Sequence, residues 1–588
     1  MKSLTFNNNI AREGAALYGY SHSSNTTLFN SSFTENTADN GGGICWGGVN
    51  SNITDSIFIG NTATINGGAI HIWVVNCIIS DSIFTNNAAT NRGGAIFWQY
   101  NNSNIFNCNF TGNHAIYGNN VYWTWTVEEF LNKYSQIHDY DYIYIRNGVG
   151  NPSSTIVLNK KGITISGQSN NVIFDAKGGN IHFEVTGDNV LIEKITFRNF
   201  NLTASNGAVH WSGDKGMLKN CNFINNTGNI GGAVCWVGTN GNIIYSTFIN
   251  NTANAAGGGI CFDGANSTLT DSTFINNIAK QYGGAIYWYN SANGILTNCT
   301  FTGNTAGNDG GAIYWHVNGV NGTLTDSTFT DNSANRNGGA ICWTGANGTL
   351  THSNFINNAA ANSAGGVYWA SSNSNISYSN FINNTAKTHD GGGASLVAPK
   401  ITLTDSTFIG NTAAAYGGGI YGSCANGTIT SSTFINNTAR IYGGGIYFSG
   451  AATKVIVKNS IFTSNAINGE GNGGGIYWNS GYGTIISTTF TDNTANYGGG
   501  AIFWNYAGSM TNCTFNNTKW IKSNGIYART NLTINGGKGI VDINNQGTLS
   551  GISIVVLNNE TYYYPPNTNI NLSDKKIKQN YGSKNELK

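Results

Sequence analysis

One stretch of the chain decides the fold: residues 329–355, FTDNSANRNGGAICWTGANGTLTHSNF. It opens with Phe329 and contains the apolar run Ala340-Ile-Cys-Trp343 directly after a Gly-Gly pair. A second strand-like run, Gly348-Thr-Leu-Thr351, precedes the next phenylalanine, Phe355. Glycine and asparagine separate these runs, as expected of tight turns between short strands. No helical period fits the pattern. The stretch therefore predicts three short strands joined by turns.

The same pattern recurs along most of the chain at steps of about 26 residues. One coil cannot bury its own apolar face, but coils stacked about 4.8 Å apart place equal residues on one another. An asparagine three residues after each phenylalanine can bond the next coil and satisfy buried backbone groups. We therefore predict an all-β fold, a right-handed parallel β-helix solenoid with three short strands per coil. The predicted ladder includes Phe223, Phe248, Phe274, Phe301 and Phe329, with Asn226, Asn251, Asn277, Asn304 and Asn332.

The paired signatures Phe-x-x-Asn and Gly-Gly-Ala-Ile resemble the repeats of chlamydial polymorphic outer-membrane proteins. The Asn/Thr-rich variant found here is similar to the adhesin-like surface proteins of methanogenic archaea. The resemblance covers about residues 1–123 and 195–530. It implies a β-helix that acts in attachment at the cell surface or outside the cell. The start, Met1–Asn9, has no signal-peptide apolar region and reads as the middle of a repeat, so we expect it to lie inside a longer domain.

The composition excludes several classes of protein. Charged residues make up 9% of the chain and the net charge is +1, whereas a nucleic-acid binder needs a basic face. An aromatic content of 12% argues against a disordered chain. No apolar run reaches the roughly 18–20 residues of a membrane helix. We expect neither nucleic-acid partners nor a membrane span.

Residues 124–195 lack the repeat signature. Thr126–Tyr134 reads as a helix with a threonine cap, and such a helix often covers the open end of a solenoid. We therefore assign residues 1–123 to the C-terminal coils of a first β-helix segment and residues 124–540 to a second β-helix with a capping helix near 126–134. Residues 541–588 are expected to form terminal strands and a frayed tail or truncated module. One continuous β-helix with a lateral insertion remains the alternative.

Some β-helix proteins are lyases or hydrolases of polysaccharides, so this fold can carry a catalytic site. Such chemistry needs clustered carboxylates. The aspartates here recur singly, in one turn of each coil: Asp55, Asp81, Asp271, Asp326 and Asp405. The nine histidines show no metal spacing and no Cys-x-x-Cys pair exists. We predict no catalytic residue, no metal site and no cofactor.

Two sets of residues in the apolar strands have predicted roles: a pair of cysteines and a row of tyrosines. Cys235 and Cys261 occupy equivalent positions in neighbouring coils, within disulfide reach, and are predicted to bridge under oxidation. In Gly-Gly-Ala-Ile-Tyr-Trp, Ile and Trp share the inward face, so the residue between them points outward. The predicted outward tyrosines are Tyr287, Tyr314, Tyr368, Tyr447 and Tyr477. Exposed aromatics suit contact with sugars or proteins, whereas packed ones would only shield the strand backbone.

These observations predict an adhesin-like surface protein that attaches through its extended β-helix. The expected partners are glycans or surface proteins of a host or a neighbouring cell. A passive structural protein of the cell wall or sheath is the first alternative. A polysaccharide lyase or glycoside hydrolase on a pectate-lyase-like β-helix is the second.

Overall fold

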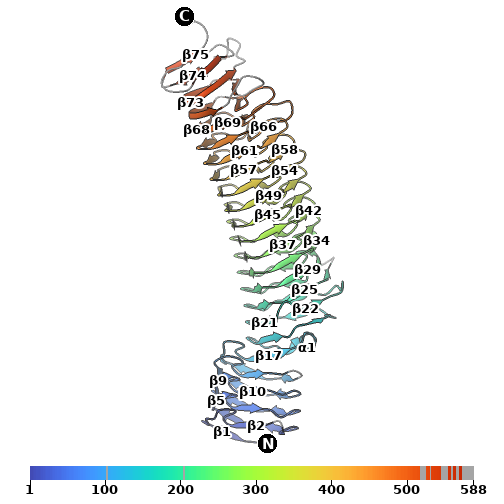
Figure 1. Ribbon diagram of the computed structural model, residues 1–588. Helices are drawn as coiled ribbons and strands as arrows, with labels where there is room; N and C mark the ends of the chain where they lie inside the picture. Colours follow the sequence, from blue (N-terminus) through green and yellow to red (C-terminus); the bar gives the residue numbers. More distant parts are fainter. Residues whose placement is uncertain are drawn as a thin grey trace. The chain divides into compact units, whose positions relative to one another are not determined.

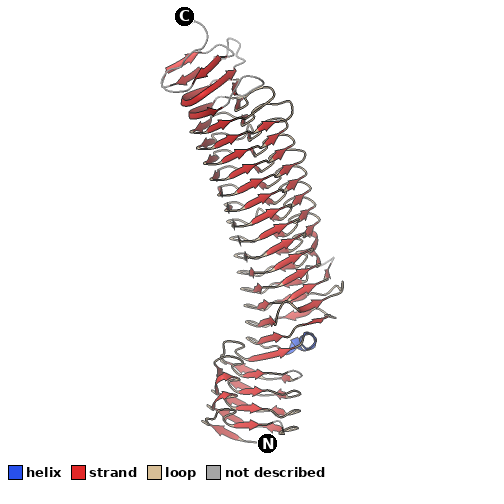
Figure 2. Ribbon diagram, in the orientation of Figure 1, coloured by secondary structure: helices blue, strands red, loops and turns tan. Residues whose placement is uncertain are grey.

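The computed structural model describes residues 1–20, 22–100, 103–202, 206–506, 508–516, 525–529, 532–544, 554–557, 560–563 and 568–571. The chain divides into two compact units, residues 1–249 (unit 1) and 250–588 (unit 2). Each unit is built from short parallel strands that follow one another around a right-handed β-helix of about 26 residues per turn (Figure 1). Figure 2 shows that strands dominate both units. The predicted fold class is confirmed.

Unit 1 begins with coils whose strands stack in separate parallel sheets. The first sheet contains β1 (Thr5–Asn7), β4 (Ser32–Thr34), β8 (Ile57–Ile59), β12 (Ile83–Thr85) and β16 (Asn109–Thr111). The second contains β3 (Thr27–Phe29), β7 (Asn52–Thr54), β11 (Ile78–Ser80) and β15 (Asn104–Phe106). A short third sheet contains β5 (Thr37–Asn40), β9 (Thr62–Asn66) and β13 (Ala88–Ala89). The apolar strands, of which β6, β10 and β14 follow a Gly-Gly pair, form a fourth row: β2 (Leu17–Gly19), β6 (Ile44–Trp46), β10 (Ile70–Ile72), β14 (Ile96–Trp98) and β17 (Val121–Trp125).

In the later coils of unit 1 the strands also pair coil to coil. One row contains β20 (Ile156–Leu158), β23 (Phe183–Val185), β27 (Val209–Trp211) and β31 (Val234–Trp236). Another contains β18 (Tyr142–Ile145), β21 (Thr164–Gly167), β24 (Leu191–Glu193), β28 (Met217–Lys219) and β32 (Asn242–Ile244). A third contains β19 (Gly148–Gly150), β22 (Val172–Asp175), β25 (Thr196–Arg198), β29 (Asn222–Ile224) and β33 (Thr247–Ile249).

In unit 2 the apolar strands form a longer row than the apolar strands of unit 1 do. They are β35 (Ile260–Phe262), β39 (Ile286–Trp288), β43 (Ile313–Trp315), β47 (Ile341–Trp343), β51 (Val367–Trp369), β55 (Ala394–Leu396), β59 (Ile420–Gly422), β63 (Ile446–Phe448), β67 (Ile476–Trp478), β70 (Ile502–Trp504) and β72 (Gly525–Ala528). The coil between β43 and β47 is typical, with β44 (Thr323–Thr325), β45 (Thr328–Thr330) and β46 (Ser333–Ala334).

The predicted phenylalanine and asparagine ladders form the core of both units. The rings of Phe301 and Phe329 stack with centroids 4.7 Å apart, and both side chains are fully buried. The side-chain oxygen of Asn332 accepts hydrogen bonds from the backbone N–H of Asn304 at 3.0 Å and from its side-chain amide at 2.9 Å. The same amide also donates to the carbonyl oxygen of Phe274 at 3.1 Å. Each buried amide is thereby bonded across coils, as the sequence predicts.

The predicted helix is present as α1 (Val127–Lys133), followed by a short 3₁₀ helix, η1 (Tyr134–Gln136). Thr126 and Glu129 form a capping box: the hydroxyl of Thr126 accepts from the Glu129 N–H, and the Glu129 carboxylate accepts from the Thr126 N–H. Phe130 of α1 is fully buried, and its ring lies 5.4 Å from that of Phe174. The helix therefore closes the core of the coils that follow it.

The strand row around residue 124 runs through the predicted segment boundary. Strand β17 pairs with β14 on one side and with β18 on the other. Among the described residues, the first three sheets of unit 1 end before α1, at β16, β15 and β13. The two compact units divide at residues 249 and 250 rather than at 124. The start of a second β-helix near residue 124 stays a prediction, and one row of strands crosses that position.

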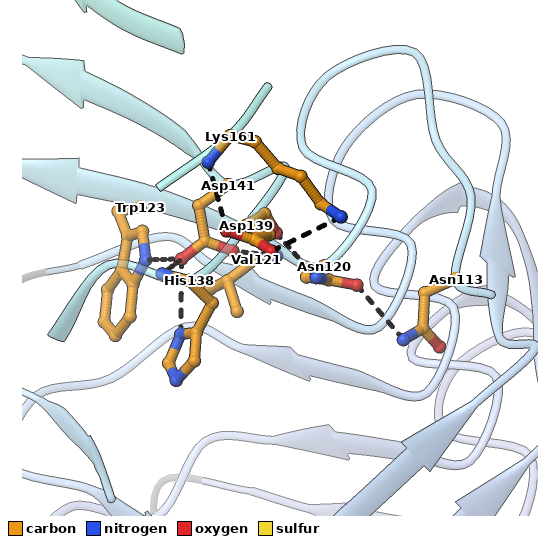
Figure 3. Close-up of polar contacts among 8 residues, drawn as sticks. All are labelled: Asn113, Asn120, Val121, Trp123, His138, Asp139, Asp141 and Lys161. Carbon is orange, nitrogen blue, oxygen red and sulfur yellow. Dashed lines mark hydrogen bonds and ion pairs between the residues drawn. The ribbon is translucent and has the colours of Figure 1, made fainter. Parts of the chain in front are cut away.

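Buried polar contacts hold this junction together (Figure 3). The Asp141 carboxylate is 1% exposed and accepts hydrogen bonds from the backbone N–H of Val121 at 3.0 Å and the indole N–H of Trp123 at 2.9 Å. It also accepts from the backbone N–H of His138 at 2.9 Å. Nearby, the side-chain oxygen of Asn113 accepts from the amide of Asn87 in the preceding coil at 3.0 Å. The amide of Asn113 in turn donates to the side-chain oxygen of Asn120 at 3.2 Å. Asp141 thus ties the strand β17 to the turn before β18.

The predicted terminal segment, residues 541–588, contains strands. The long strand β73 (Leu532–Asn544) pairs in parallel with β71 (Gly508–Asn516) and antiparallel with β76 (Thr568–Asn571). Between β73 and β76 in the sequence, β74 (Ile554–Leu557) and β75 (Glu560–Tyr563) form an antiparallel pair. Residues 572–588, expected as a frayed tail or truncated module, lie outside the described residues.

Candidate functional site

The outward positions of the apolar strands in unit 2 form the predicted surface. Ile286 and Trp288 are fully buried, and Tyr287 between them is half-buried and points away from the core. The alternation predicted from the sequence is confirmed. We call this register of residues the outward row: Cys261, Tyr287, Tyr314, Cys342, Tyr368, Ser395, Tyr421, Tyr447, Tyr477, Phe503 and Tyr527.

At one end of this row lies a group of partly exposed rings, which we call the aromatic patch: Tyr282, Tyr287, Tyr289, Tyr314 and His316. The ring of Tyr287 lies 5.3 Å from that of Tyr289, which lies 4.9 Å from the His316 ring. Burial raises the pKa of Tyr314 to about 12 and raises that of Tyr287 further. These hydroxyls therefore stay protonated at neutral pH and can both donate and accept hydrogen bonds.

Further along the row the prediction of an exposed stripe is wrong. Tyr447 and Tyr477 are only 8% and 6% exposed. Their rings pack with Phe503 and Tyr527, and three more tyrosines lie against that cluster: Tyr416, Tyr421 and Tyr442. The ring of Tyr442, for example, lies 4.4 Å from that of Tyr477. These two tyrosines shield the strand backbone, the role expected of packed aromatics. Cys342 and Ser395 interrupt the row on either side of Tyr368.

Two carboxylates of unit 2 are engaged by other groups, and the first of them, Asp309, lies near Tyr314 of the aromatic patch. Asp309 is 2% exposed and accepts hydrogen bonds from Nε and Nη2 of Arg336 and from the Asn337 N–H. Asp390 is half-buried, which raises its pKa, and it accepts a hydrogen bond from the Tyr416 N–H at 3.2 Å. The recurrent turn aspartates have left-handed backbone torsions, with φ of 47–52°, as turn residues do: Asp55, Asp81, Asp271, Asp326 and Asp405.

The predicted disulfide joins residues of different units. Cys235 is buried in β31 of unit 1, and Cys261 is buried in β35 of unit 2. The bridge between them stays a prediction. Within unit 1, Cys235 is hydrogen-bonded to His210, and this bond together with the Glu184 carboxylate raises the pKa of His210 to about 9.

One group that the sequence did not predict lies in unit 1. The ligating atoms of Glu13, Cys45 and His71 all lie within 4.8 Å of one another. The sequence offered a signal, because Cys45 and His71 occupy the same register position in successive apolar strands. Motif spacing missed it because the three residues lie a coil or more apart in the sequence.

Comparisons with known proteins agree with this architecture. The family described as right handed beta helix region matches residues 258–426 and 316–473. The Chlamydia polymorphic membrane protein repeat matches residues 55–72, 81–97 and 487–503. No curated protein sequence matches the chain. The similarity to adhesin-like proteins of methanogenic archaea stays a prediction.

Solved structures with detectable similarity include several carbohydrate-active enzymes. A mannuronic acid specific polysaccharide family 6 lyase from human gut microbiota is 12% identical, with 62% of this chain and 86% of that chain covered and a TM-score of 0.39. A GH87 α-1,3-glucanase catalytic domain is 13% identical, with 64% and 63% covered and a TM-score of 0.32. A PL6 alginate lyase is 12% identical, with 76% and 92% covered and a TM-score of 0.25.

In the described part of the chain, no helix has the length and hydropathy that crossing a membrane requires. The strand pairing, the two ladders and the matched repeats all agree with stacked β-helix coils. The chain is a right-handed parallel β-helix repeat protein that carries repeats of the chlamydial polymorphic membrane protein type.

Proposed function

We propose that the chain is an adhesin-like protein at the cell surface or outside the cell, which attaches through its β-helix to glycans or proteins of a host or neighbouring cell. The matched membrane-protein repeats support the location. The aromatic patch supports the binding role, and it is the observation that carries the proposal.

The aromatic patch has the properties of a preformed binding surface. Its rings present partly exposed apolar faces beside neutral hydroxyl groups, a combination that suits sugar rings and polar protein surfaces. Buried Ile and Trp neighbours anchor each strand, as Ile313 and Trp315 do on either side of Tyr314. A ligand would therefore not have to order this surface, which favours affinity.

The two alternatives have less support. A passive wall or sheath protein would need no partly exposed ring group, whereas the chain presents one. A lyase or hydrolase would need carboxylates free to exchange protons with a substrate. Beside the aromatic patch, Asp309 is instead held by Arg336.

Binding of the whole chain to cells and to arrayed glycans tests the proposal. The variant Tyr287→Ser/Tyr289→Ser/Tyr314→Ser removes three rings of the patch and leaves the buried anchors in place. Tyr378→Ser is the matched control, because Tyr378 is 54% exposed in unit 2 but lies in a different turn. We expect the triple variant to lose at least tenfold in binding while the control binds as the natural chain does. Equal binding by all three folded proteins would favour a passive role.

A further inference from the structure

Three potential metal ligands come together in unit 1, on the side of β6 and β10 that faces away from the core. The Sγ atom of Cys45 lies 3.4 Å from Oε2 of Glu13 and 4.0 Å from Nδ1 of His71. Thiolate, imidazole and carboxylate are the ligand types that zinc takes in proteins.

The β-helix register builds this group. Cys45 and His71 are paired positions in the neighbouring strands β6 and β10. Glu13 stands just before β2, the strand on the other side of β6, and pairs with Asn40 of the next coil. Three successive coils thus supply one ligand each, and their strands fix the spacing.

The spacing suits a tetrahedral ion. Zinc lies about 2.3 Å from sulfur and about 2.0–2.2 Å from nitrogen or oxygen, which puts the sulfur about 3.5–3.7 Å from the other ligand atoms of a tetrahedral site. The Cys45–Glu13 distance of 3.4 Å is close to this range, and the Cys45–His71 distance of 4.0 Å exceeds it by a few tenths. All three ligand atoms lie within 4.8 Å of one another, so rotations of the side chains would complete the geometry.

Each ligand is oriented by a second residue, as in natural metal sites. The Asn40 amide donates to Oε1 of Glu13 at 3.2 Å and leaves Oε2 directed at Cys45. Oε1 of Gln99 lies 3.2 Å from Nε2 of His71. If the amide oxygen of Gln99 accepts, the histidine proton is on Nε2 and Nδ1 carries the lone pair that faces Cys45.

The electrostatics also favour a dication. The thiol of Cys45 donates a hydrogen bond to Oε2 of the Glu13 carboxylate. A divalent ion would displace the thiol proton, and its two positive charges would balance one thiolate and one carboxylate. The neutral total suits a site in which Cys45 is 2% exposed.

We propose that Glu13, Cys45 and His71 bind a zinc ion. His71 also lines a pocket of about 510 Å³, together with Asn40, Arg92, Gln99 and Tyr122. Glu13 is partly exposed, so solvent can supply the fourth ligand, as in zinc sites with three protein ligands.

Zinc and cobalt titrations of the whole chain test this site. Calorimetry of the reduced protein with Zn²⁺ should show tight binding at one site, and Co²⁺ should give the near-ultraviolet charge-transfer band of a thiolate ligand. Cys45→Ser and His71→Gln should each weaken Zn²⁺ binding at least 100-fold and, for Cys45→Ser, abolish the cobalt band. Gln99→Leu should weaken it about tenfold, because Gln99 only orients His71.

Cys235→Ser is the matched control, because Glu184, His210 and Cys235 follow one another in register in another part of unit 1. We expect this variant to bind Zn²⁺ and Co²⁺ like the natural chain. The circular dichroism and melting temperature of each variant confirm folding, and His71→Gln decides the case if Cys45→Ser does not fold. Absence of tight binding by the natural chain overturns the proposal, as does loss of binding in Cys235→Ser but not in Cys45→Ser.

Discussion

The side-chain amide of Asn304 donates a hydrogen bond of 2.9 Å to the side-chain oxygen of Asn332, one coil further along the chain. Both residues are fully buried, and the same oxygen also accepts the backbone N–H of Asn304. The ladder thus joins coils through side chains as well as through the strands. This pairing leads to the first prediction.

Asn304→Ala should destabilise unit 2. The change leaves the Asn277 groups that bond to Asn304 without their acceptor. It also removes the side-chain amide that donates to the Asn332 oxygen and to the Phe274 carbonyl, while the backbone N–H of residue 304 still donates to Asn332. Unsatisfied buried groups cost about 1–3 kcal/mol each, so we expect a clear drop in the urea midpoint. Asn318→Ala is the control, since its exposed amide bonds only to Asn290 among the described contacts. Equal midpoints for the two variants would show that the ladder contributes no stability.

Asp141→Ala should destabilise unit 1 strongly. The substitution removes the acceptor of the N–H groups of Val121, Trp123 and His138, all of which bond to this buried carboxylate (Figure 3). We expect a loss of about 3 kcal/mol in the free energy of unfolding, measured by urea denaturation. Asp139→Ala provides the comparison, because the Asp139 side chain is 43% exposed and pairs with Lys161 at the surface. A larger effect at Asp139 than at Asp141 would contradict the assigned role.

His210 should make the stability of unit 1 depend on pH. Its pKa is raised to about 9 by hydrogen bonds with Cys235 and Glu184, above the ordinary value of about 6.5. The folded state therefore binds the proton more tightly than the unfolded state. The resulting stability is fully present below about pH 6.5 and is lost as the pH rises through about 9.

Urea midpoints measured at about pH 6, 7.5 and 9 check this prediction. The natural chain should lose stability across the series, and His210→Gln should show a flatter dependence. His316→Gln is a suitable control, because burial lowers the pKa of His316 and so gives it the opposite trend. An identical slope in His210→Gln and the natural chain would remove His210 as the cause.

The fold could be predicted from the sequence because each coil repeats the same requirements. Phe329 and Asn332 recur at one register position in coil after coil, and stacking alone then places like on like. The helix near residue 126 was also predictable, since a threonine followed three residues later by glutamate is a local signal.

The surface could be predicted only in part. Alternation places Tyr447 and Tyr477 outward, yet it does not reveal that Tyr442, from the turn before the strand, packs over them. The cluster of Glu13, Cys45 and His71 escaped prediction for a related reason. Register between coils, rather than spacing within a motif, brings such side chains together.

Affinity of the aromatic patch for a ligand is the most direct test of the attachment role. The measurement is a calorimetric titration of the best glycan from the array into the natural chain, the triple variant of Tyr287, Tyr289 and Tyr314, and Tyr378→Ser. The quantity to compare is Kd. Stacking on each ring contributes about 1 kcal/mol to the free energy of binding, so the loss of three rings corresponds to a rise in Kd of about a hundredfold. The account predicts that Kd rises at least tenfold in the triple variant alone. An unchanged Kd in a folded triple variant would contradict it.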